Sequence, residues 1–165
     1  QSIFEQQFHR GPSFPLWFAF IAIMAMSGSM LNSRIVMTLG MRRVVIRTYA
    51  GVLGLSLSAL VLTASGVLPD SLGFAVQVLW CIGLFAMMGL TMGNLNALAM
   101  EPVGHIAGMA ASVISAIATV GSVLLAIPVG LAFNGTSTPL LGGVAVLSGL
   151  ALLLSRYGLG ARPKA

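Results

Sequence analysis

The chain has 165 residues, of which 58% are hydrophobic and 7% are charged, whereas soluble domains are about 25% charged. About 20 helical residues cross the roughly 30 Å hydrocarbon core of a bilayer, so five spans and their connections would leave no sizeable soluble domain. The net charge of +5 sits at the ends of apolar stretches, which favours membrane orientation over nucleic-acid binding.

The first predicted span runs from about Phe14 to Met37. Pro15 is typical of the first turn of a helix, and Trp17 is typical of an anchor at the membrane interface. Residues 1–13 are polar around Arg10. They are interpreted as the end of an earlier helix followed by an outside loop. The chain is therefore expected to lack an N-terminal part.

Four further spans are predicted at about Val44–Val67, Leu72–Ala97, Ile106–Phe133 and Pro139–Tyr157. The predicted fold is all-α, a polytopic membrane bundle of five transmembrane helices over residues 14–157, followed by a tail at 158–165. All eight Lys and Arg residues except Arg10 fall on one side of this threading. That asymmetry predicts a cytoplasmic C-terminus.

Small residues recur at helical spacing in two of these spans. Gly89 and Gly93 are four apart in the third span. The fourth span repeats small residues at steps of four, three and four, at Gly108, Ser112, Ser115 and Thr119. Such stripes let another helix approach closely, so we predict helix packing at both. The fifth span has almost no polar side chains, and we expect it to face lipid.

The sequence offers no chemistry for catalysis. No predicted span carries Asp, Glu or Lys, and intramembrane charge is the usual marker of a proton pathway. No catalytic constellation or metal-ligand spacing is visible. The single cysteine, Cys81, lies within a span and has no partner for an internal disulfide. We expect a protein that is not an enzyme and uses no metal or cofactor.

Two polar joints lie on the predicted cytoplasmic face. Glu101 and His105 are four apart and would share a helical face if Pro102 begins an α-helix. One hypothesis makes Glu101 a gate latch that pairs with a basic residue of the neighbouring joint. The alternative is an ordinary solvated carboxylate, because surface ion pairs contribute about 0–1 kcal/mol. The neighbouring joint supplies Arg34, Gly40, Arg42 and Arg43.

Several residues within the spans have two interpretations. Met26 and Met88 each have a second methionine four residues later, and flexible methionine faces suit a pocket for apolar ligands. Packing or lipid contact is the commoner explanation. Gln77 and Trp80 share a face of the third span. Buried amides need partners, which are either neighbouring helices or a substrate.

The joints resemble those of a known transporter family. Gly28–Arg34 (GSMLNSR) and then Leu39–Arg43 (LGMRR) resemble the joint between the eighth and ninth helices of major facilitator superfamily transporters. Asn94–Ser112 (NLNALAMEPVGHIAGMAAS) is similar to the joint between the tenth and eleventh helices of drug:proton antiporters, nearest the bicyclomycin and chloramphenicol resistance branch. Phe133–Pro139 (FNGTSTP) is similar to that branch's next outside loop. One departure is Met37, which stands where the signature has an acid.

The resemblance implies the last five helices of a twelve-helix fold that exports small, mostly apolar drugs in exchange for protons by alternating access. The coupling acids would lie in a missing N-terminal half. Drug, proton, lipid bilayer and that half are the implied partners, and a bacterial inner membrane is the implied location. Residues implied at the substrate cavity are Met26, Gln77, Trp80 and Met88. The alternative is a non-transporting five-helix scaffold subunit, which would use the stripe of the fourth span to dock partners.

Overall fold

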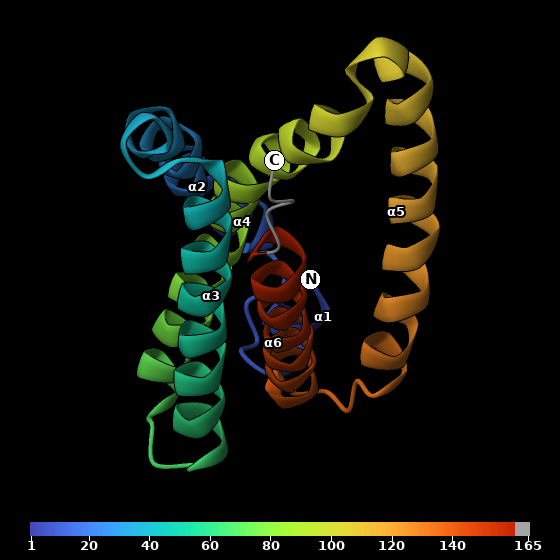
Figure 1. The fold of residues 1–165 in the computed structure, drawn as a ribbon. Helices are drawn as coiled ribbons and strands as arrows, with labels where there is room; N and C mark the ends of the chain where they lie inside the picture. The colour runs from blue at the N-terminus through green and yellow to red at the C-terminus, as the bar shows by residue number, and fades with distance from the viewer. Residues whose placement is uncertain (161–165) are drawn as a thin grey trace.

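The structure is a computed structural model that describes residues 1–160. Regular secondary structure in that range is entirely helical (Figure 1). The elements are α1 (Ser2–Gln6), α2 (Phe14–Leu39), α3 (Met41–Ala64), α4 (Asp70–Met100), the 3-10 helix η1 (Glu101–Ile106), α5 (Ala107–Leu131) and α6 (Thr138–Gly160). The predicted tail began at residue 158, whereas α6 continues to Gly160. Arg162 and Lys164 of that tail lie outside the described residues.

Four helical segments are long and apolar enough to cross a membrane: Phe14–Leu39, Met41–Ala64, Asp70–Leu131 and Thr138–Gly158. The third segment contains two of the predicted spans, because η1 follows α4 and precedes α5 with no loop between them. The chain nevertheless changes direction there, with Val103 at φ −123° and ψ 26°, and α5 then runs back along the molecule (Figure 1). The all-helical fold is confirmed for the described residues, with four segments that are long and apolar enough to span a membrane, whereas the count of five spans stays a prediction.

A single glycine separates α2 from α3. Gly40 adopts φ 77° and ψ 151°, a conformation that is essentially restricted to glycine. Helical structure resumes at the next residue, Met41. The predicted joint was therefore too long, and Arg42 and Arg43 lie in the first turn of α3 rather than in a loop.

Helices α3 and α4 together form the centre of the packing, because α4 packs on α2 and α3, and α3 also packs on α6. The crossing of α2 and α4 is so close that a Cβ added to Gly28 would overlap the backbone of Ala86. A Cβ added to Gly89 would lie 2.8 Å from the backbone nitrogen of Ser29. Glycine on both helices thus permits backbone contact.

An aromatic cluster fixes α1 and the start of α2 against α4. Phe4 of α1 is 5% exposed, and its ring meets that of Phe74 edge to face with centroids 5.4 Å apart. Trp17 packs on the same ring at 4.8 Å, and the Arg10 guanidinium lies 4.5 Å from its centroid. Gln7 adds a tie to the far end of the chain, since its side-chain oxygen accepts a hydrogen bond from the Ser137 backbone N–H at 2.7 Å. Residues 1–13 are therefore part of the folded unit.

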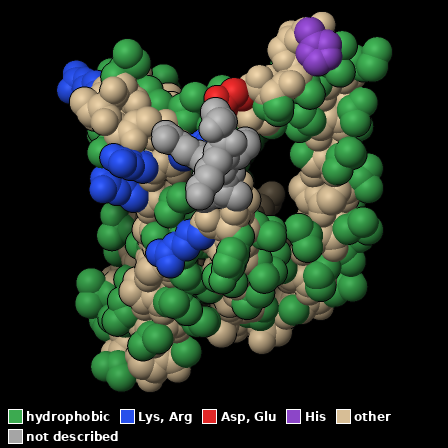
Figure 2. All heavy atoms as spheres, in the orientation of Figure 1, with side chains coloured by type: hydrophobic (Ala, Val, Ile, Leu, Met, Phe, Trp, Pro, Cys, Tyr) green, Lys and Arg blue, Asp and Glu red, His purple; other side chains and the backbone are tan. Residues whose placement is uncertain are grey.

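The two C-terminal helices differ in how far they pack against the rest of the described chain. Helix α6 was expected to face lipid, yet it packs on α3 and buries one stripe of Leu141, Ala145, Ser148, Leu152 and Ser155. Helix α5 has no buried residue. It stands apart from the other helices, connected at its ends, and the space-filling view shows an opening beside it (Figures 1 and 2). Apolar composition alone did not reveal this packed stripe. The opposite side of α6 is exposed, as at Val146 and Leu154, and its contact with lipid stays a prediction.

Candidate functional site

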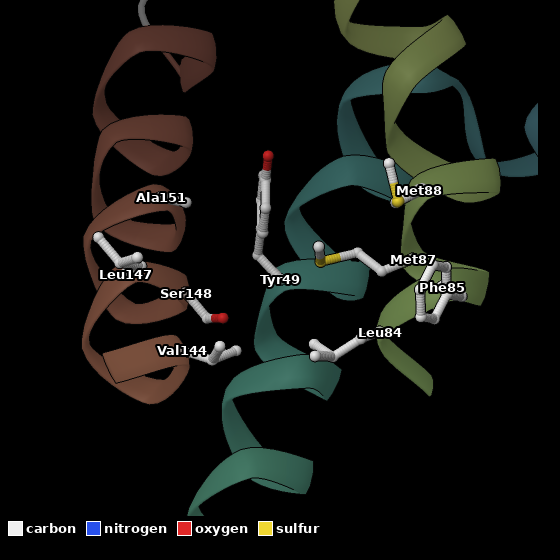
Figure 3. Close-up of a pocket in the computed structure, with 9 residues that line it drawn as sticks. All are labelled: Tyr49, Leu84, Phe85, Met87, Met88, Val144, Leu147, Ser148 and Ala151. Atoms are coloured by element: carbon white, nitrogen blue, oxygen red, sulfur yellow. The ribbon is translucent and has the colours of Figure 1, made fainter. Parts of the chain in front are cut away.

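An apolar cavity of about 430 Å³ lies between α3, α4 and α6. It is bounded by the middle portions of α4 and α6 and by Tyr49 on α3. Figure 3 shows the Tyr49 ring standing between α6 and α4, with Val144 and Ser148 pointing toward it from α6. The other side chains at its wall are Leu84, Phe85, Met87, Met88, Leu147 and Ala151.

The chemistry of this cavity suits a small apolar molecule. Its volume lies within the range of about 300–1,000 Å³ that is typical of ligand sites. Polar side-chain groups at the wall are limited to the Tyr49 and Ser148 hydroxyls. Met87 and Met88 are flexible and polarizable, so the wall can adapt to ligands of different shape. The cavity can therefore offer many dispersion contacts and few hydrogen bonds.

The structure separates the four residues predicted at the substrate cavity. Met88 lines the cavity of Figure 3. Gln77 lies in a second, smaller cavity bounded by α1, α2, α4 and α6. Met26 is 67% exposed on α2 and lines neither of them. The four residues do not form one site in this conformation.

Trp80 is a packing residue in this structure. It is 1% exposed and lies with Ala59 and Leu141 in the contact of α3, α4 and α6. Its indole N–H donates a hydrogen bond of 2.9 Å to the Ser56 hydroxyl, which is itself fully buried. Of the two interpretations, a partner on a neighbouring helix describes Trp80 in this structure.

Sequence reasoning missed Tyr49 and Ser148 at the cavity. Tyr49 follows a run of basic residues and carries no distinguishing pattern. Ser148 had a usable signal, because it continues the small and apolar stripe of α6 at steps of three and four from Ala145 and Leu152. Such spacing marks one face of a helix.

The basic end of the molecule holds the joint residues. Arginine side chains gather at the end where α2 meets α3 (Figure 2). Arg42 Nη2 lies 3.7 Å from Glu101 Oε2, beside a cavity of about 370 Å³ that Gly40, Arg43 and Leu98 also line. The two side chains are 40% and 64% exposed, so solvent screens the pair and its contribution to stability is about 0–1 kcal/mol. Glu101 therefore pairs with a basic residue of the neighbouring joint, as the latch hypothesis requires. Its role in gating stays a prediction.

The remaining joint residues lie elsewhere at that end. Arg34 lines a shallow cavity with Ser27, Met30 and Leu31. His105 lies in η1, where about three residues make one turn. Four residues therefore do not bring it onto the same face as Glu101, and the expectation that these two residues share an α-helical face is wrong.

The predicted packing residues divide into two groups. Gly89 lies at the close crossing of α4 and α2, whereas an added Cβ at Gly93 or Gly108 would meet nothing within 4 Å. The stripe on α5 is exposed at Ser112, Ser115 and Thr119. The Ser112 and Thr119 hydroxyls donate hydrogen bonds to backbone carbonyls of their own helix. The described part of this chain supplies no helix to pack on that stripe.

Among residues 1–160, no three His, Cys, Asp or Glu side chains gather in a way that could hold a metal ion. Comparison with protein-family models, with curated proteins and with solved structures gives no match to this chain.

Proposed function

We propose that the chain forms the last five helices of a major facilitator drug:proton antiporter, nearest the bicyclomycin and chloramphenicol resistance branch. Such a transporter exports small, mostly apolar drugs in exchange for protons by alternating access. The fold alone does not assign this activity. The sequence of the two joints suggests the family, and the structure contributes the arrangement described next.

The observation that carries the proposal is the incomplete packing of α5. Helix α4 fits between α2 and α3, and α3 packs on α6, yet α5 buries no residue. Small residues on its exposed face suit close approach of another helix. A missing half of the transporter is the partner proposed for this face, and the apolar cavity of Figure 3 is of a size and polarity that suit its substrates.

The proposed orientation places the basic end of the bundle in the cytoplasm of a bacterial inner membrane. Arg34, Arg42, Arg43 and Arg47 lie near the joint of α2 and α3, and Arg156 lies in the last turns of α6. Arg10 lies before α2, at the opposite end. Positive charge concentrates on the cytoplasmic side of membrane proteins, which supports this orientation.

Proton-coupled export is tested with the complete coding sequence of which this chain is a part. In inverted membrane vesicles acidified by respiration, chloramphenicol or bicyclomycin should release protons from the lumen, as recorded by a fluorescent pH probe. Deleting the gene should raise drug sensitivity. Unchanged sensitivity to a broad drug panel, with no proton release, would contradict the proposal. The coding sequence upstream of Gln1 should encode about seven further apolar spans.

The same vesicles test the latch. Glu101→Gln removes the charge that lies beside Arg42 and should change the rate of drug-driven proton release while leaving thermal stability nearly unchanged. Glu5→Gln is the matched control, since Glu5 is an exposed carboxylate on α1, at the other end of the bundle. Equal rates for both variants and the wild type would rule out a gating role.

The scaffold alternative rests on the exposed stripe of α5. A photo-cross-linking residue at Ser115 should capture another part of the same polypeptide in the transporter reading. In the scaffold reading, it should capture a separate membrane subunit. The mass of the cross-linked product, analysed by peptide sequencing, distinguishes the two.

A further inference from the structure

A second cavity, of about 180 Å³, lies at the opposite end from the basic joint, and four phenylalanine rings form part of its lining. Phe4 comes from α1, Phe14 and Phe18 from α2, and Phe85 from α4. The Phe4–Phe14 and Phe18–Phe85 pairs meet edge to face, with centroids 5.3 Å and 5.8 Å apart. Aromatic pairs prefer such edge-to-face arrangements, which favours these ring positions at the cavity wall.

Two amide side chains, those of Gln1 and Gln77, line this cavity, and only that of Gln77 is buried. Gln77 lines the cavity and is 3% exposed. Its side-chain N–H donates a hydrogen bond to Cys81 Sγ at 3.7 Å, and a thioether or thiol sulfur is only a weak acceptor. Within the described residues its carbonyl oxygen accepts no hydrogen bond.

The Gln77 oxygen is nevertheless not sealed in protein. Among the described side chains, no fully enclosed nitrogen or oxygen atom lacks a hydrogen-bond partner. The Gln77 oxygen therefore keeps some accessible area, and the cavity that Gln77 lines is where a donor could reach it. Burial of an amide without its hydrogen bonds is unfavourable, so a donor placed in the cavity would be stabilised.

The volume restricts the ligand to about one ring. An apolar cavity of about 150 Å³ in another protein accepts benzene, and this cavity is slightly larger. The phenylalanine rings and Leu140 provide edge and face contacts for an aromatic ring. The free Gln77 oxygen adds one acceptor on one side.

We infer that this cavity is a binding site for a single-ring aromatic molecule that carries one hydrogen-bond donor, such as a phenol. The ring fills the space between the phenylalanine side chains, and its hydroxyl donates to the Gln77 amide oxygen. As a substrate subsite this inference rests on the proposed export function. As a binding site it does not depend on transport.

The test uses the full chain in detergent with p-cresol and toluene, which differ by one hydroxyl group. Equilibrium dialysis with radiolabelled ligands measures affinity. One hydrogen bond to the amide should make p-cresol bind about three- to tenfold more tightly than toluene. In Gln77→Leu, which keeps the side chain's approximate size, the two ligands should bind equally. Absence of saturable binding, or a p-cresol preference that survives in Gln77→Leu, would overturn the inference.

The single cysteine of the chain locates the bound ligand. Cys81 lines the cavity, so p-cresol should slow its alkylation by N-ethylmaleimide. The control is a double variant, Cys81→Ser with Met26→Cys. Its single cysteine lies at an exposed position of α2 outside the cavity. The alkylation rate of that cysteine therefore responds only to p-cresol dissolved in the detergent micelle. Equal slowing at both positions would place p-cresol in detergent and refute the site.

A second variant guards against misfolding of Gln77→Leu. Phe18→Trp enlarges a side chain that is 45% exposed and lines the cavity, and it should reduce p-cresol binding several-fold. Unchanged binding in a folded Phe18→Trp protein would also refute the site. Binding without drug-driven proton release contradicts only the export function, whereas release without binding contradicts only this inference.

Discussion

At the scale of single residues, the buried pair of Trp80 and Ser56 shows how polar groups are used in this bundle. The indole N–H and the hydroxyl come from neighbouring helices, and both side chains are essentially inaccessible. A polar group in an apolar interior is costly unless it has a partner. The pair therefore fixes the contact of α3 with α4 as well as filling space.

Trp80→Phe should lower the stability of the folded protein by about 1 kcal/mol, because it leaves the Ser56 hydroxyl without its donor. Thermal or SDS-induced unfolding in detergent measures the change. A double-mutant cycle with Ser56→Ala isolates the hydrogen bond from the smaller ring volume. A coupling energy close to zero would show that packing alone accounts for the buried indole.

At the scale of elements, the crossing of α2 and α4 depends on two glycines with no room for a side chain. Gly28 faces the backbone of Ala86, and Gly89 faces Ser29. All three atoms nearest to a Cβ on Gly28 are backbone atoms of Ala86, and the backbone nitrogen of Ser29 lies beside the Ser29 hydroxyl at Gly89. Backbone atoms cannot move aside as the end of a flexible side chain can. The separation of the two helices is thus set by the absence of Cβ atoms.

Gly28→Ala should force α2 away from α4 and lower stability by about 1–3 kcal/mol, as overpacked interiors do. Gly93→Ala is the matched control, since the added methyl group would meet nothing within 4 Å, and alanine favours a helix. The melting temperatures of both variants in detergent provide the comparison. Equal melting temperatures would mean that the crossing is looser than the structure indicates.

At the scale of the whole molecule, basic residues and aromatic packing mark opposite ends of the bundle. Basic residues mark one end of the bundle, where α2 meets α3 (Figure 2). The aromatic cluster around Phe74 marks the other end. The charge asymmetry sets the orientation in which the chain inserts into a membrane. The packing of α4 between α2 and α3 instead forms the folded core.

Reporter fusions test the orientation. Green fluorescent protein joined after Ala165 should fluoresce, and alkaline phosphatase at the same point should be inactive, because the predicted C-terminus is cytoplasmic. Phosphatase inserted near Gly66, in the turn between α3 and α4 at the opposite end, should be active. The reverse activities would overturn the assigned orientation, and activity of both phosphatase fusions would contradict the threading between them.

Much of the helical architecture was accessible from the sequence. Predicted and observed helix ends differ by a few residues, as for Val44 against Met41 at the start of α3. Gly40 alone separates α2 from α3. The basic residues that follow it in the sequence made the joint look longer than it is. The 3-10 geometry of η1 was not predictable from the i, i+4 spacing of Glu101 and His105. Residues four apart share a face only in an α-helix, so the use of this spacing already assumed an α-helix.

The site was less accessible. Met88 and Gln77 do line cavities, but different ones, and Trp80 lines neither. Which cavity a side chain enters depends on how helices cross, and the crossing of α2 and α4 is set by contacts between residues far apart in the chain, such as Gly28 and Ala86. Sequence patterns within one helix do not show which residue of another helix will contact it.

The contrast between α5 and α6 separates what the sequence determined from what the tertiary structure decided. Apolar composition and charge placement determined that the chain is helical and suited to a membrane. Both helices carry stripes at steps of three and four, yet the stripe through Ser148 is buried and the stripe through Ser115 is exposed. Lipid tails are as apolar as leucine side chains, so hydrophobicity cannot distinguish a face toward lipid from a face toward another helix. Only the packing of α6 on α3 in three dimensions determined which face of α6 is buried against protein.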